Sequence, residues 1–164
     1  MRNFLLTCCI TLFAVTFMTA QDYKSSVGGK LGYGLVGSYK TFLNEKSAVE
    51  LFGGLRGFGG GLVVGGFYQI HKDIPTIDNL RWFIGGGASF STWTFIAGSG
   101  YTEITGHFDI GLEYTFDDLP LNISVDYAPG VVLVDTYKYS GSYGRFRGGY
   151  GALTVRYILD GDKK

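Results

Sequence analysis

The chain has 164 residues, of which 14 are basic and 14 are acidic, so its formal net charge is zero. This balance excludes the basic patch that a nucleic-acid-binding protein needs, and we expect no nucleic acid among its partners. Glycine (27 residues), phenylalanine (13) and tyrosine (12) are abundant while proline (3) is scarce, a composition typical of an all-β protein.

The first 20 residues have the features of a secretory signal peptide. Arg2 precedes an almost uncharged run over residues 4–17, and Ala20 supplies a small residue at the expected cleavage point. We therefore predict a signal peptide over residues 1–20 and one domain over residues 21–164. Cys8 and Cys9 lie in the leader, so the mature chain has no cysteine for a disulfide or a thiolate metal site, and we expect no cofactor. No later apolar run reaches the length of about 18 residues that a spanning helix needs, which leaves strands to cross a membrane.

Turn residues divide the rest of the chain into eight predicted strands. They cover residues 26–33, 35–43, 48–56, 61–71, 80–93, 104–116, 121–134 and 149–159. The division of residues 26–43 into two strands is the weakest, because little more than Gly34 separates them. An even number of strands, with both chain ends on one side, is the rule for bacterial single-chain barrels, and this favours two strands there. The longest predicted loop covers residues 135–146.

The alternation is clearest over residues 104–127. Apolar or aromatic side chains occupy every second position from Ile104 to Phe116, and polar residues or glycines lie between them. A period of two predicts a strand. After the polar turn 117–120 the alternation resumes from Leu121 to Tyr127, so the two strands are predicted to form a hairpin.

Charged side chains lie on the strand faces opposite the large apolar ones. Trp82, Phe90, Tyr157 and similar residues are together too bulky for eight strands to enclose, but they suit a belt that faces lipid. We therefore predict that the polar faces line the lumen, where basic and acidic groups pair. Inward glycines are expected to leave space for long charged side chains there: Gly65, Gly85, Gly87 and Gly111. The predicted lumen charge network, with a structural role, consists of Lys40, Glu50, Arg56, Arg81, His107, Asp109, Glu113, Asp126 and Arg156.

Two histidines are candidates for chemistry. His107 shares its face with Asp109 and Glu113, an arrangement that a lipid-modifying acyltransferase could use as a base with an orienting carboxylate. A serine two positions away on the same strand is missing, so we predict no catalytic residue. His71 lies beside Lys72 at a strand end, where we predict a solvated or interfacial side chain rather than a metal ligand.

Four segments carry a resemblance: YKTFLNEKSAVE, GGFYQIHK, RWFIGGGASF and GLEYTFDDLPLNISVDYAP. In order and spacing they resemble the small outer-membrane β-barrel proteins of Bacteroidota, which are similar in architecture to OmpA/OmpX-type eight-stranded barrels. The resemblance covers about residues 26–159 and implies fold and location rather than an activity. It also implies recognition by the barrel-assembly machinery through a terminal signal, which corresponds here to Gly151, Leu153, Val155 and Tyr157. Such barrels commonly finish on a terminal aromatic residue, whereas residues 158–164 follow this signal.

The sequence therefore predicts an all-β, eight-stranded, antiparallel, up-and-down transmembrane β-barrel in the cell outer membrane. The expected function is non-enzymatic: a barrel in contact with outer-membrane lipid, with a plugged lumen and a structural or surface-interaction role through its extracellular loops. Loop 135–146, rich in Tyr, Ser and Gly, is where we place any extracellular ligand. Two alternatives stay open, a lipid-modifying outer-membrane enzyme and a soluble lipocalin-like carrier, and the carrier requires the opposite orientation of the strand faces. The sequence does not identify a ligand or an oligomeric state.

Overall fold

The computed structural model describes residues 23–32, 34–56, 60–94, 100–136, 145–148 and 150–159. The expected signal peptide (1–20), the end of the chain (160–164) and the central part of the longest loop (137–144) lie outside these residues. All regular elements in the described residues are strands. In this part of the chain no helix has the length and hydropathy needed to cross a membrane.

The described residues form ten strand segments. In chain order they are β1 (Ser25–Leu31), β2 (Gly34–Phe42), β3 (Ser47–Arg56), β4 (Gly61–Asp73), β5 (Leu80–Thr94), β6 (Gly100–Thr115), β7 (Leu121–Tyr127), β8 (Gly130–Asp135), β9 (Phe146–Arg147) and β10 (Gly151–Ile158).

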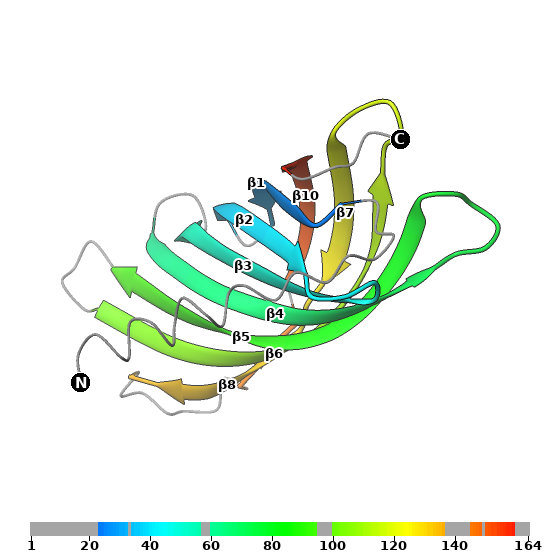
Figure 1. Ribbon diagram of the computed structural model, residues 1–164. Helices are drawn as coiled ribbons and strands as arrows, with labels where there is room; N and C mark the ends of the chain where they lie inside the picture. Colours follow the sequence, from blue (N-terminus) through cyan, green and yellow to red (C-terminus); the bar gives the residue numbers. More distant parts are fainter. Residues whose placement is uncertain are drawn as a thin grey trace, which may run out of the picture.

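The segments close into an eight-stranded antiparallel barrel. β7 and β8 pair with successive parts of β6, so together they act as one strand of the barrel. β10 pairs with β7 and β9 pairs with β8, so β9 and β10 together act as another. The ring closes where β1 pairs with β10, and Figure 1 shows these two segments side by side. Among the described segments, each one except β9 pairs with strands on both sides, so ring closure leaves little free sheet edge.

The predicted strands agree with most of the observed ones, and the differences concern their ends and their division into segments. Residues 26–43 form two strands, and the bend between them includes Gly32 at φ 136°, a conformation that favours glycine. β6 begins at Gly100, so residues that we assigned to a loop before Ile104 belong to the strand. The predicted strand 121–134 is divided into β7 and β8, and β9 lies before the last predicted strand, 149–159, which corresponds to β10.

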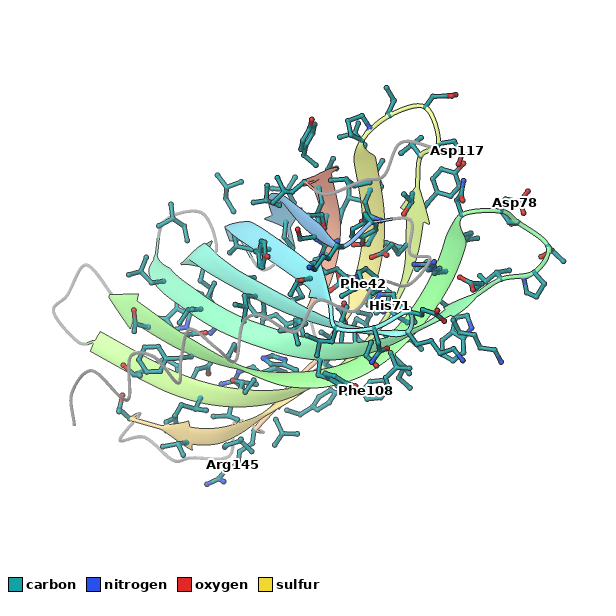
Figure 2. The ribbon with its side chains drawn as sticks, in the orientation of Figure 1. Phe42, His71, Asp78, Phe108, Asp117 and Arg145 are labelled. Carbon is teal, nitrogen blue, oxygen red and sulfur yellow. The ribbon has the colours of Figure 1, made fainter. Side chains whose placement is uncertain are left out.

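The barrel has two ends, which we name by what they contain. The termini end holds the start of β1, the end of β10 and the turns 43–46, 74–79 and 116–120. The loop end holds the connections after β1, β3, β5 and β8. At the termini end Asn79 Nδ2 donates to Asp117 Oδ1 at 2.6 Å and links two neighbouring turns, which carry Asp78 and Asp117 in Figure 2.

The two faces of the barrel have opposite polarity. Strand residues of one parity are buried inside and are largely polar or charged, while those of the other parity are apolar and exposed outside. Phe108, labelled in Figure 2, is an outward residue on β6. The outward set includes Leu51, Leu62, Val64, Tyr68, Ile70, Trp82, Phe90, Ile104, Phe108, Ile110, Leu112, Val125, Leu153, Val155 and Tyr157.

Three inward phenylalanines each lie opposite a glycine of the next strand. The pairs are Phe52 with Gly65, Phe67 with Gly87, and Phe83 with Gly111. A Cβ built on Gly65 would lie 2.5 Å from Phe52 Cζ, and one on Gly87 would lie 2.7 Å from Phe67 Cδ1, so the rings occupy the space that a side chain would need. This corrects our expectation that these glycines leave room for charged side chains. At the fourth inward glycine, Gly85, the space is occupied by the backbone of Tyr68 and Gln69.

Candidate functional site

The interior of the barrel is the candidate site, and β3 shows how it is organised. Along this strand the inward side chains are Ala48, Glu50, Phe52 and, beyond Gly54, Arg56, in order from the termini end to the loop end. Each belongs to a different layer of the lumen. The layers are an apolar cap, a central charged layer, an apolar septum and a polar cluster at the loop end.

The cap closes the termini end and is apolar. It is a buried cluster of Tyr23, Phe42, Ala48 and Ile158. Tyr23 precedes β1 in the chain, yet it is only 1% exposed. Burial raises the pKa of the Tyr23 phenol well above its ordinary range, and the neighbouring Glu113 carboxylate raises it further.

Directly beneath the cap lies a group of buried charges around Glu113. Tyr23 donates its hydroxyl to Oε1 of Glu113 at 3.0 Å, and Lys40 pairs with Oε2. His71 Nε2 lies 2.8 Å from Lys40 Nζ. The centroids of the His71 and Phe42 rings are 4.9 Å apart, and Figure 2 labels these two residues side by side. His71 is therefore buried, which contradicts our prediction of a solvated or interfacial side chain at a strand end.

Glu50 is the centre of the charged layer. Its Oε1 accepts from Arg156 at 2.7 Å, Ser38 at 2.8 Å and Lys30 at 3.2 Å, and its Oε2 accepts from Gln69 at 3.0 Å. A carboxylate with this many donors, two of them cationic, is compensated for its burial.

The same layer holds two further acids. Gln69 donates from Nε2 to Asp109 Oδ2 at 2.7 Å, and Lys30 Nζ lies 3.2 Å from Asp126 Oδ2. The Lys30 ammonium also lies over the Phe67 ring, 5.3 Å from its centroid. Lys30 thereby joins the charged layer to the septum above it.

The septum is an apolar layer across the barrel. It is a buried cluster of Val36, Phe52, Val63, Phe67, Ala128 and Ala152. The rings of Phe52 and Phe67 stack with centroids 5.2 Å apart. Together with the cap, the septum encloses the charged layer between two apolar layers.

A polar cluster lies between the septum and the loop end, around Glu103. This carboxylate pairs with Arg56 and accepts from Tyr101 at 2.8 Å and from Arg147 at 3.1 Å. The Arg56 guanidinium lies over the Trp93 ring, 4.6 Å from its centroid. The contacts of the Arg147 side chain with Tyr101 and Glu103 link β9 to β6.

His107 has a serine partner that sequence inspection missed. Ser89 Oγ, on β5, lies 2.9 Å from His107 Nε2, and His107 Nδ1 lies 3.2 Å from the Ala128 carbonyl oxygen. We had sought a serine on the strand of His107, whereas register places Ser89 on the neighbouring strand. Both side chains are buried, and the His107 ring packs against Phe67 and Tyr150. The pair has the contact of a nucleophile and a base, but the packed rings leave the histidine covered.

The structure places most of the predicted network inside the barrel. Lys40, Glu50, Arg56, His107, Asp109, Glu113, Asp126 and Arg156 are buried. Arg81 lies at the rim of the termini end, where its Nε donates at 2.7 Å to Asp73, an exposed carboxylate. Sequence inspection missed Lys30 and Glu103. Lys30 was detectable, since it has the polar parity of the predicted strand 26–33, but Glu103 lies outside the predicted strand 104–116, whereas β6 begins at Gly100.

The structure also locates the expected assembly signal and the side chains that could bind a metal. The residues proposed as an assembly signal, Gly151, Leu153, Val155 and Tyr157, share the outward face of β10. Among the described residues, no group of three or more His, Cys, Asp or Glu side chains is arranged to hold a metal ion.

Comparison with known proteins identified no relative of this chain. No family model, no curated protein and no solved structure matches the chain.

Proposed function

We propose that the chain is a non-enzymatic integral protein of the outer membrane, which crosses the bilayer as a β-barrel with a plugged lumen. The inverted polarity of the barrel carries this proposal: charged and polar groups are buried inside, and large apolar side chains are exposed around the outside. In water this apolar surface would be a continuous aggregation-prone patch, whereas lipid tails would cover it. The same polarity supports membership of the small outer-membrane barrels that the four segments resemble, with lipid and the barrel-assembly machinery as partners.

The first test is fractionation of cells that produce the full chain, followed by gel electrophoresis of unheated and heated samples. We expect the protein in the outer-membrane fraction and a change in its migration on heating, because a closed barrel resists unfolding by detergent until it is heated. A soluble periplasmic protein without this shift would contradict the proposal. The lipocalin-like carrier needs the apolar faces inside, around its ligand cavity, whereas this barrel has charged side chains there.

A structural or surface-interaction role through the loop-end loops is the second part of the proposal. The base of the longest loop is held to the barrel by backbone hydrogen bonds from Val132 N to Arg145 O at 2.8 Å and from Thr136 N to Thr102 O at 3.0 Å. We therefore expect that replacing residues 137–144 by a Gly-Ser linker of equal length leaves the heat-dependent gel shift unchanged. Loss of the shift would mean that the loop is needed for the barrel, and any surface partner should be tested against this variant.

The alternative function, lipid modification, gains one observation from the contact between Ser89 and His107. It can be tested by treating the folded, detergent-solubilised protein with a fluorophosphonate, which labels activated serines. Because both side chains are buried against aromatic rings, we expect no labelling. Labelling that disappears in Ser89→Ala would favour an enzyme over an inert barrel.

A further inference from the structure

Tyr23 differs from the other members of the cap in its position in the chain. Phe42, Ala48 and Ile158 lie on strands of the barrel, whereas Tyr23 lies two residues before β1 begins. A residue outside the strands at a barrel end is normally exposed. Here the chain turns inward, so that the ring lies edge-on to Phe42 with centroids 5.1 Å apart and an interplanar angle of 88°.

The buried ring covers the group of charges around Glu113. The Tyr23 hydroxyl is bound to Glu113, which pairs with Lys40, and the Phe42 ring contacts the rings of both Tyr23 and His71. On the side toward the loop end, the charged layer meets the apolar cluster of the septum. Access to His71 from the termini end therefore depends on the cap.

The backbone beside Tyr23 is anchored independently of its side chain. Phe42 N donates to Lys24 O at 2.9 Å, and Leu159 N donates to Ser25 O at 2.9 Å. These bonds fix β1 and its neighbours from Lys24 onwards. The Tyr23 ring can consequently move out of the cap by rotation about the backbone bonds next to Lys24. This rotation breaks none of the pairing of β1.

We propose that Tyr23 is a stopper, hinged at Lys24, whose ring seals the termini end of the lumen. When the ring is docked, Lys40, His71 and Glu113 are closed off from water. When it leaves, water and small solutes reach these groups, while the septum keeps the barrel closed to passage. The inference goes beyond the proposed function, because it concerns access to one end of the lumen wherever the barrel is located.

The test measures access to His71 with diethyl pyrocarbonate, a small reagent that modifies neutral imidazole, and locates the modified residues by peptide mass spectrometry. The folded full-length protein in detergent is compared with Tyr23→Ala, Tyr23→Phe and Tyr39→Ala. Tyr39 is an outward tyrosine of β2 and serves as the matched control. His107, beyond the septum, is an internal control in every sample.

We expect His71 to be protected in the wild type, in Tyr39→Ala and in Tyr23→Phe, which keeps the ring. In Tyr23→Ala we expect His71 to react at least about tenfold faster, since the reaction rate follows the open population, while His107 stays protected. Protection of His71 in Tyr23→Ala, equal reaction of both histidines, or fast reaction of His71 in Tyr23→Phe would each overturn the stopper.

The heat-dependent gel shift is recorded on the same samples. A variant that keeps the shift has kept the barrel, so a negative result there concerns the stopper and not the fold or the location. If Tyr23→Ala loses the shift, Tyr23→Leu, which retains apolar volume without the ring, replaces it and is judged by the same outcomes.

Discussion

At the scale of single residues, Arg156 shows why the lumen charges depend on one another. Its Nε donates to Ser38 at 3.0 Å, its Nη1 to Ser124 at 2.9 Å and its Nη2 to Glu50 at 2.7 Å, all in the buried interior. Removal of one partner from a buried ion pair leaves the other charge without compensation, which is more costly than the pair itself is stabilising.

We predict that Arg156→Met lowers the free energy of unfolding by about 3–5 kcal/mol, because Glu50 keeps its charge but loses its shortest cationic partner. Urea unfolding of the protein refolded into lipid vesicles measures the change. Arg145→Met is the matched control, since Arg145 is exposed near β8 (Figure 2) and its removal should leave stability almost unchanged. Equal effects of the two substitutions would contradict a buried charged layer.

At the scale of strands, each phenylalanine–glycine pair packs an inward ring into the space beside a glycine of the neighbouring strand. Gly111 of β6 lies beneath the Phe83 ring, and a Cβ there would also lie 2.5 Å from the Val125 carbonyl oxygen. Gly29 of β1, in contrast, has open space around it. It faces outward, and a Cβ there would meet no atom within 4 Å.

We predict that Gly111→Ala destabilises the barrel by about 1–3 kcal/mol through overpacking. Gly29→Ala should have little effect, although it makes the same chemical change in a strand. The same urea titration measures both variants. If Gly111→Ala were as stable as Gly29→Ala, the Phe83 ring would not be confined by this glycine.

At the scale of the whole molecule, the polarity of the surface distinguishes a membrane barrel from a soluble one. Phe108 and Ile77 have almost equal exposure, 48% and 51%, but Phe108 lies within the apolar outer face of β6 and Ile77 lies on the turn between β4 and β5. In water the two positions are equivalent sites for a charge. In a bilayer they are not, because the cost of a charge depends on its depth.

We predict that Phe108→Lys lowers stability in lipid vesicles by about 2–4 kcal/mol, the cost of a lysine on the lipid face near the bilayer centre. Ile77→Lys should leave it nearly unchanged. Equal and small effects for both substitutions would indicate that the outer face of the barrel is not in lipid.

Much of this barrel was predictable because strand geometry is local. Successive side chains point to opposite faces, so alternation identified the strands and placed residues such as Glu50, Glu113 and Trp82 on the correct faces. The even strand number followed from the turn residues and from the rule for bacterial barrels. The resemblance to known outer-membrane barrels pointed to the same architecture.

The sequence by itself thus determined which residues face inward, whereas only the tertiary structure decided which of them meet. Lys40 contacts Glu113, 73 positions away, and Tyr23 contacts Glu113, 90 positions away, because ring closure and strand register bring distant strands to the same height. Ser89 meets His107 for the same reason. Alternation carries no information about register between distant strands. Only the tertiary structure therefore shows the layers of the lumen, the phenylalanine–glycine pairs and the inward turn of Tyr23.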